Sequence, residues 1–193
     1  MSGFQGRALL AEKFENSLFK QLAGMGFAIA ANGTEHTHPD FVARLKNSND
    51  QTSLAIRFQP DAVACIGRMP RSFYVEAKAA RTIERQAWEQ YEKLVANGNI
   101  LAIVFEKFAW TWNFWQDIHL IPAEETIGRY PIHQRFPVID GWVTPRGSKQ
   151  WKNIRDATPR ASGTAFREVD KKSLLPFASF KEIVIEQLAG ART

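Results

Sequence analysis

The sequence contains a single cysteine, Cys65, which lies within an apolar run. It cannot form an internal disulfide, and this fits a protein that is kept in a reducing compartment. No apolar run approaches the length that a transmembrane helix needs, and the first ten residues, MSGFQGRALL, lack the apolar segment and the cleavage site of a signal peptide. We therefore expect a cytoplasmic protein that has no membrane partner.

Internal repeats and low-complexity tracts are also absent, as are the patterns of a helix-turn-helix and of a zinc finger. The lack of such modules argues against sequence-specific recognition by an appended domain. The 45% hydrophobic and 23% charged residues are typical of a soluble globular protein, and 193 residues are enough to bury a substantial core. We expect one domain over residues 1–193, with a core over about 7–121 and a basic C-terminal extension over about 144–193.

Acidic residues are outnumbered by basic ones, and the formal net charge of +5 favours a polyanionic partner. The most basic stretch is 144–172, with eight Lys or Arg against three Asp or Glu. Phosphate-backbone contacts are predicted for five of these residues. They are Arg146, Lys149, Lys152, Arg155 and Arg160. A solvated basic surface is the alternative that the sequence leaves open.

The chain is organised around residues 59–79, QPDAVACIGRMPRSFYVEAKA. Two apolar runs, 61–66 and 72–78, flank a short connection that contains Gly67 and Pro70. Strand-like runs on both sides of a connection of this length predict a β-hairpin.

Side chains alternate along the second strand of this hairpin, so Glu76 and Lys78 fall on one face, opposite a face of apolar residues. Asp61 follows Pro60 at the start of the first strand, where strand pairing brings its carboxylate near Glu76. Two carboxylates and an ammonium group therefore meet at one place. Carboxylates are preferred ligands of Mg²⁺, and such an ion beside an ammonium group suits hydrolysis of a phosphodiester.

The arrangement Pro60-Asp61, fourteen residues, then Glu76-Ala77-Lys78 resembles the signature of the PD-(D/E)XK nuclease superfamily. The resemblance covers about 100 residues, from the first predicted helix to a strand that ends near residue 106. It implies a restriction-endonuclease-like fold, DNA as the substrate, and Mg²⁺ as the cofactor with Mn²⁺ as the alternative metal.

The same resemblance implies a role for each residue of the motif. Asp61 and Glu76 would be metal ligands, and the backbone carbonyl of Ala77 would be a further ligand. Lys78 would position the water that attacks the phosphate.

The predicted fold is α/β, with an αβββαβ core in which helices flank a mixed central sheet. We expect helices over 7–24 and from Thr82 to Asn97, and strands over 53–58, 61–66, 72–78 and 100–105. An aromatic-rich hairpin over 108–121 would extend the sheet, and a helix over 179–188 would close the chain. The aromatic row of that hairpin can form core or stack unpaired bases, and core is the more common role.

Glu15 lies inside the apolar stripe of the first predicted helix. A carboxylate that faces a core is costly unless it is paired or bound to a metal. Many members of the resembled superfamily carry an acidic residue of the first helix at the metal site, so Glu15 is a candidate additional ligand. The alternative is a side chain at the edge of the stripe that reaches water. Gln86 and Gln90, one turn apart on the second helix, are accessory candidates by the same resemblance, with a plain surface role as the alternative.

His36, His38 and Asp40 have a spacing that resembles the start of the metallo-β-lactamase motif, but no histidine follows Asp40. We expect a polar loop near the site rather than a metal centre. Pro39-Asp40 is also a second Pro-Asp pair. No tight hairpin connects it to Glu76, so Asp61 is preferred.

These residues predict a metal-dependent deoxyribonuclease that selects DNA by structure. The alternative is a nucleic-acid-binding protein that keeps a nuclease-like fold without cleaving. In a third class, an interaction protein, Glu76 and Lys78 would form an ordinary ion pair. A homodimer is compatible with the first function, because cutters of junctions and duplexes often need two active sites. The sequence leaves open the oligomeric state, the DNA structure that is cut, and whether cleavage is internal or terminal.

Overall fold

The computed structural model describes residues 3–32, 50–69, 71–107, 109–129, 136–145 and 164–190. The five predicted phosphate-contacting residues, 146 to 160, and the motif of His36, His38 and Asp40 lie outside the described residues. None of the described helices is long and apolar enough to cross a membrane.

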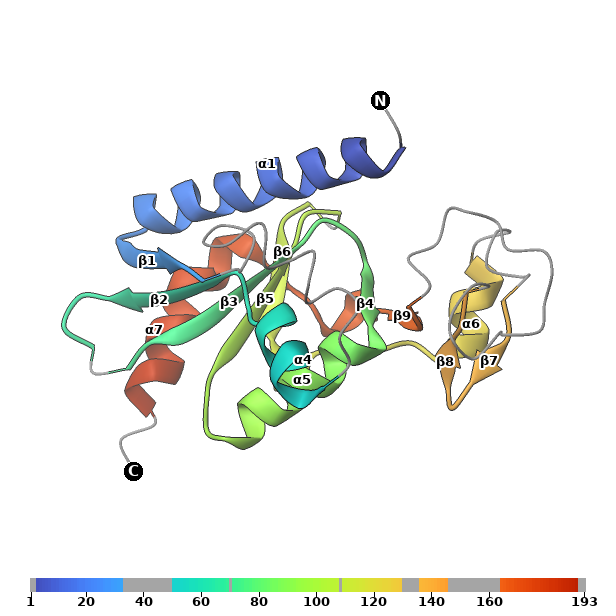
Figure 1. The fold of residues 1–193 in the computed structure, drawn as a ribbon. Coiled ribbons are helices and arrows are strands. Elements are labelled where there is room, and N and C mark those ends of the chain that lie inside the picture. Colours follow the sequence, from blue (N-terminus) through green and yellow to red (C-terminus); the bar gives the residue numbers. More distant parts are fainter. Residues whose placement is uncertain are drawn as a thin grey trace.

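A six-stranded mixed sheet forms the centre of the molecule, with strand order β1-β2-β3-β5-β6-β10 (Figure 1). Its strands are β1 (Phe27–Ala31), β2 (Ala62–Ile66), β3 (Phe73–Lys78), β5 (Leu101–Phe105), β6 (Thr111–Phe114) and β10 (Leu175–Pro176). Strands β3 and β5 pair in parallel, and the other neighbours pair antiparallel.

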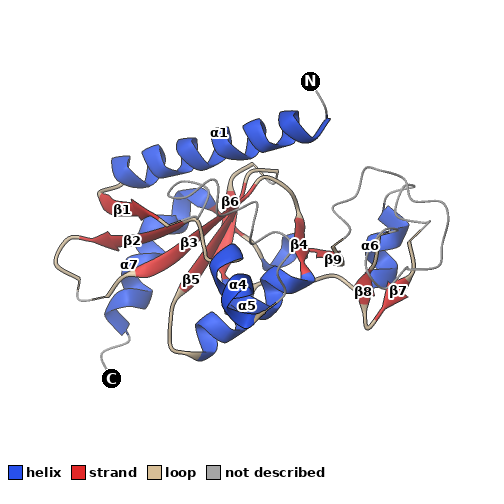
Figure 2. Cartoon of the chain, in the orientation of Figure 1, coloured by secondary structure: helices blue, strands red, loops and turns tan. Residues whose placement is uncertain are grey.

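Helices cover both faces of this sheet (Figure 2). On one face, α1 (Gly3–Gly24) and α7 (Phe180–Gly190) bury Phe14, Leu18 and Phe180 against the strands. On the other face, α5 (Arg85–Ala96) buries Ala87 and Tyr91 in a second apolar cluster, and Phe58, which follows the short helix α4 (Gln51–Arg57), packs against that cluster. The α/β fold with a mixed central sheet between helices is therefore confirmed. It is consistent with the restriction-endonuclease-like arrangement that the resemblance implies.

Strand β5 shows why the central strands were readable from sequence. All five of its residues are buried. Ala102 and Val104 face the cluster under α1, whereas Leu101, Ile103 and Phe105 face the cluster under α5. A strand that is covered on both faces needs a continuous apolar run, and the parallel pairing with β3 requires the crossover helix that α5 provides.

The predicted strand over 53–58 is wrong, because Gln51–Arg57 forms helix α4. Asp50 caps this helix, since its side chain accepts hydrogen bonds from the backbone nitrogen of Ser53 at 2.9 Å and from the Ser53 hydroxyl at 2.6 Å. Leu54 and Phe58 are four residues apart, so their spacing fits a helical face as well as a strand. The first strand of the αβββαβ order is instead β1, which pairs with β2.

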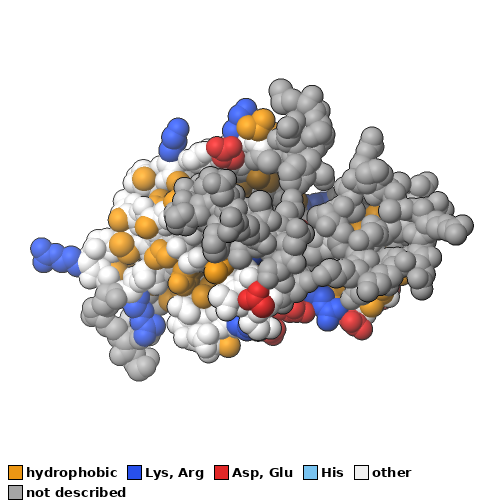
Figure 3. All heavy atoms as spheres, viewed as in Figure 1, with side chains coloured by type: hydrophobic (Ala, Val, Ile, Leu, Met, Phe, Trp, Pro, Cys, Tyr) orange, Lys and Arg blue, Asp and Glu red, His pale blue; other side chains and the backbone are white. Residues whose placement is uncertain are grey.

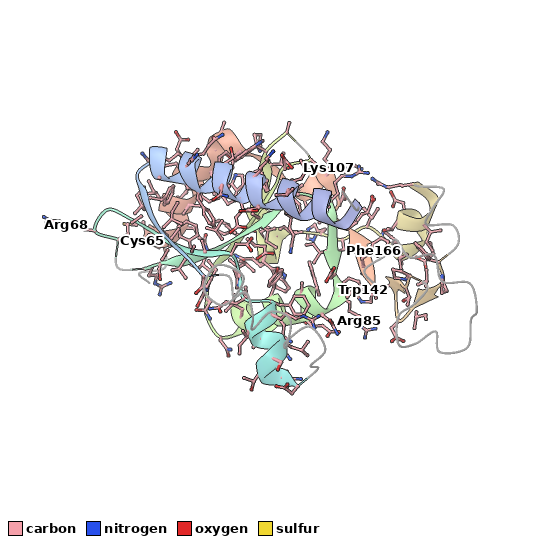
Figure 4. All side chains as sticks on the ribbon, turned by 45° about the horizontal axis from the view of Figure 1, so that its top comes forward. Cys65, Arg68, Arg85, Lys107, Trp142 and Phe166 are labelled. Carbon is pink, nitrogen blue, oxygen red and sulfur yellow. The ribbon has the colours of Figure 1, made fainter. Side chains whose placement is uncertain are left out.

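The predicted start of the second helix at Thr82 is also wrong. Thr82–Glu84 forms the short strand β4, and Glu84 is the N-cap of α5. Strand β4 belongs to a second sheet of order β4-β9-β8-β7, whose other strands are β7 (Val138–Ile139), β8 (Trp142–Val143) and β9 (Phe166–Glu168). Helix α6 (Ala123–Arg129) packs against β8 and β9. Figure 4 shows Trp142 and Phe166 within this second sheet and Arg68 pointing away from the body of the molecule at the β2–β3 connection.

The aromatic strand extends the central sheet as predicted, but its hairpin partner differs. Strand β6 pairs antiparallel with β5 and then with β10. Residues 115–117 form a single 3₁₀ turn instead of leading into a returning strand, and two further 3₁₀ turns cover Lys171–Ser173 and Phe177–Ser179. Trp112 and Phe114 are buried in the core beside α7, so the core role of the aromatic row is confirmed.

Candidate active site

Asp61 and Glu76 are brought together by the register of the β2–β3 hairpin. Ala62 pairs with Val75, so the position before Ala62 lies across from Glu76. The Asp61 carboxylate accepts a hydrogen bond from the backbone nitrogen of Ala77 at 2.7 Å. This bond fixes one carboxylate oxygen at the end of β3, beside the side chain of Glu76.

Lys78 completes this group from the same strand. Its ammonium nitrogen lies 2.5 Å from Oε1 of Glu76. The Glu76 side chain is only 6% exposed, whereas the Lys78 side chain keeps 26% of its surface in contact with solvent. Glu76 is therefore buried, and its partner Lys78 is partly exposed to solvent.

Tyr91, on α5, also belongs to this group, although the sequence pattern does not mark it as a site residue. It is almost fully buried, and its hydroxyl forms a hydrogen bond with Glu76. The Lys78 nitrogen lies 5.9 Å from the centre of the Tyr91 ring. The sequence signal for it is the apolar stripe of α5. Ala87 and Tyr91 share the buried face of this helix, and a buried tyrosine hydroxyl needs a polar partner.

The charges of the site perturb one another. Burial raises the pKa of Asp61 well above its ordinary value, and the negative charges of Glu76 and Glu15 raise it further, against the opposing effects of Lys78 and the Ala77 N–H. Burial alone would lower the pKa of Lys78, but Glu76, Tyr91 and Asp61 outweigh it and raise that pKa well above its ordinary value. Burial and then Glu76 raise the pKa of Tyr91. At neutral pH the lysine is therefore a cation and the tyrosine a neutral donor.

Glu15 points inward from α1 and is 9% exposed. Its negative charge contributes to the raised pKa of Asp61. Within the described part of the chain, however, no three Asp, Glu, His or Cys side chains come close enough together to hold a metal ion. Glu15 thus adds negative charge near the pair of Asp61 and Glu76 without forming a three-carboxylate cluster with them.

The two predicted accessory glutamines face away from this group. Gln86 accepts a hydrogen bond from Nη2 of Arg57 at 3.0 Å, which ties α5 to α4. Gln90 lines a groove between α4 and α5. Helical geometry explains this placement, because Gln86 and Gln90 are one turn apart on the α4 side of α5, whereas Tyr91 is rotated about 100° from Gln90 toward β3.

Comparison with models of known protein families and with curated proteins gives no match for this chain. Among solved structures, the chain is similar to Hjc, a Holliday junction resolvase from the archaeal hyperthermophile Archaeoglobus fulgidus. The two are 18% identical with a TM-score of 0.37, and the match covers 55% of this chain and 77% of that one. At this level of similarity, what this chain does has to be inferred from its own residues.

Proposed function

We propose that this chain is a metal-dependent nuclease that hydrolyses phosphodiester bonds of DNA. The observation that carries the proposal is the convergence of Asp61, Glu76 and Lys78 at the β2–β3 hairpin, with the Asp61 carboxylate fixed on the Ala77 N–H. Burial and then the charge of Glu76 raise the pKa of Asp61, so a nearby positive charge would stabilise the ionised pair. A polyanionic substrate would increase the need for such a charge.

The donor set fits a hard divalent cation. Asp61 and Glu76 would hold it, with the backbone carbonyl of Ala77 as a third oxygen donor and Glu15 as an additional acidic group. Mg²⁺ is commonly bound by one or two carboxylates and keeps its remaining positions for water and phosphate oxygens, and Mn²⁺ takes similar ligands. When bound, the ion would supply positive charge that polarises the phosphodiester.

Lys78 would act as a fixed donor and not as a base, because its raised pKa keeps it protonated at neutral pH. Its ammonium group would orient the attacking water through a hydrogen bond and offset the charge that develops on the phosphate. Tyr91 would hold the Glu76 carboxylate in place through its hydroxyl. The site would thus combine two negative ligand groups with one permanent cation.

DNA as the partner is supported by the formal net charge of +5. On the face drawn in Figure 3, the Lys and Arg side chains of the described residues lie at separate places around the edge rather than in one patch. The stretch that carries Arg146, Lys149, Lys152, Arg155 and Arg160 remains our candidate for phosphate contacts on the basis of its sequence.

The test is cleavage of labelled duplex, single-stranded, flap and four-way-junction DNA with Mg²⁺, Mn²⁺ or EDTA. We expect metal-dependent cleavage that falls at least about a hundredfold in Glu76→Ala and in Lys78→Ala. Glu89→Ala and Lys181→Ala, at exposed positions on α5 and α7, are matched controls that should keep the wild-type rate.

Two outcomes would contradict the proposal. Cleavage that survives Glu76→Ala would place the site elsewhere. A wild-type protein that binds DNA in a salt-dependent way but cuts none of the substrates would be a binding module with a nuclease-like fold.

A further inference from the structure

A groove lies beside the candidate active site, between α4, α5 and the start of β3. Its volume is about 610 Å³, within the range of roughly 300–1,000 Å³ that is usual for small-molecule sites. Six of its lining residues carry the argument. They are Phe58, Gln59, Pro60, Tyr74, Gln90 and Lys93.

Two residues that line the groove are sequence neighbours of the candidate active site. Pro60 lines the groove and immediately precedes Asp61. Tyr74 lines it from the face of β3 that also carries Glu76, and the two residues are about 7 Å apart along the strand. A ligand group in the groove therefore lies next to the position beside Asp61 and Glu76.

The chemistry of the lining fits a nucleobase. Tyr74 provides an aromatic ring, which can stack on any base, and Phe58 adds apolar surface under the Arg57 guanidinium, which lies 4.7 Å from the centre of its ring. Gln59 and Gln90 provide amide groups, which can donate to and accept from base edges. Among the described lining residues none is acidic, and Lys93 adds a positive charge to the lining, which can attract a phosphate.

Helix α4 forms one wall of the groove. Side-chain hydrogen bonds at both of its ends connect it to α5. Arg57 bonds to Gln86, and Nζ of Lys93 donates to Oε1 of Gln51 at 2.7 Å. On α5, Gln90 lies between Gln86 and Lys93, the two residues that form these hydrogen bonds. Its own side chain makes no hydrogen bond to the described residues. Its amide group is therefore available for a ligand.

We propose that this groove between α4, α5 and β3 binds an unpaired nucleobase of the DNA next to the phosphate that is cleaved. This inference rests on the proposed nuclease function and deepens it, because it names DNA with unpaired bases as the preferred substrate class. A base that is paired inside a duplex cannot enter the groove without leaving the stack, which costs free energy. Flaps, single strands and junction branch points offer such a base at little cost.

The first experiment measures binding by fluorescence anisotropy in EDTA, so that no cleavage is needed. The ligands are a labelled twelve-nucleotide single strand and the corresponding blunt duplex. The variant Gln90→Ala/Lys93→Ala is compared with the control Lys20→Ala/Gln21→Ala, which removes the same residue types from exposed positions on α1. We expect the groove variant to bind the single strand about tenfold more weakly, with no greater loss on duplex than the control shows.

A second measurement separates a base from a mere charge effect. Single abasic sites are introduced along the twelve-nucleotide strand one position at a time. Wild-type protein should lose about tenfold in affinity when the base for the groove is missing. Tyr74→Leu, which removes the ring and keeps an apolar side chain, should lose most of that sensitivity.

The inference is overturned if the groove variant weakens single-strand and duplex binding equally, or if abasic sites at all positions leave the affinity of the wild type unchanged. Its failure is distinguishable from failure of the proposed function. Cleavage that depends on Glu76, with no abasic effect, keeps the nuclease and removes the base pocket. An abasic effect that Tyr74→Leu abolishes, in a protein that cuts nothing, keeps the pocket and removes the nuclease.

Discussion

At the scale of single residues, the site holds more negative than positive charge. Asp61 and Glu76 are both acidic, Glu15 adds to their field, and Lys78 supplies a single ammonium group. Packing negative charges together inside a fold costs stability, and such a cost persists at positions where function requires it. The residues of this site are therefore expected to trade stability for activity.

Asp61→Asn tests this trade. The asparagine keeps an oxygen that can accept the Ala77 N–H bond and removes the repelled charge. We expect the Tm without metal to rise by roughly 2–4 °C at neutral pH, while cleavage is lost and added Mg²⁺ no longer raises the Tm. An unchanged or lower Tm would contradict the repulsion.

The pH dependence of this gain has a defined sign. Because the native pKa lies above the unfolded one, the stability of the wild type falls as the pH rises from the ordinary aspartate pKa to the native pKa, and the loss is complete above the native pKa. The Tm advantage of Asp61→Asn should therefore shrink as the pH falls and vanish below the ordinary aspartate range, where both states of the wild type are protonated. Melting curves between acid and neutral pH measure this directly.

Tyr91→Phe tests the tyrosine as a positioning residue for Glu76. We expect the cleavage rate to fall about tenfold and the Mg²⁺ concentration for half-maximal rate to rise, because the carboxylate loses one of its restraints. Loss of the hydrogen bond should lower the stability by only about 1 kcal/mol. Ile83→Val, a comparable loss in the same apolar cluster, is the control that should leave the Mg²⁺ dependence unchanged. Equal effects of the two changes would reduce Tyr91 to a packing role.

At the scale of elements, helix α1 shows how far an apolar stripe follows the core. Phe14, Leu18 and Leu22 are buried on the sheet, but Leu10, at the same spacing, is 61% exposed. The apolar stripe therefore continues onto a residue that the described part of the fold leaves exposed. Periodicity predicts which face of a helix is apolar, and the length of the partner layer decides how much of that face is buried.

A pair of leucine substitutions measures this limit. Leu18→Ala should lower the free energy of unfolding by about 2–5 kcal/mol, because it leaves a cavity in the core. Leu10→Ala should change it by less than about 0.5 kcal/mol. Urea denaturation gives both values, and similar losses at the two positions would mean that Leu10 is covered in solution.

Helix α4 and strand β4 show at the same scale where sequence patterns fail. The spacing of Leu54 and Phe58 fits a helix and a strand equally well. The Asp50 cap favours the helix, and it depends on a local hydrogen bond that the spacing of apolar residues does not reveal. Thr82 is a good N-cap residue by type, yet its backbone pairs with Glu168, which lies 86 residues later in the chain. Tertiary pairing overrode the local preference in the second case.

At the scale of the whole molecule, net positive charge should govern DNA affinity. The logarithm of the binding constant should fall linearly with the logarithm of the salt concentration. Lys149→Ala/Lys152→Ala should reduce the slope by about 2, since each phosphate contact contributes about one unit. Lys20→Ala/Lys181→Ala, two exposed lysines on α1 and α7, is the charge-matched control. Equal slopes in the two variants would make the stretch of residues 146–160 an ordinary solvated surface.

The sequence by itself determined the hairpin of β2 and β3, the buried strand β5 and the motif of Asp61, Glu76 and Lys78. Each rests on local rules, because alternation, a continuous apolar run and hairpin length act within a few residues. Only the tertiary structure decided that β1 is the first strand, that Tyr91 reaches Glu76, and that α4 and α5 enclose a groove beside the site. These features depend on packing between segments far apart in the chain, and no single segment determines the free energy of such packing.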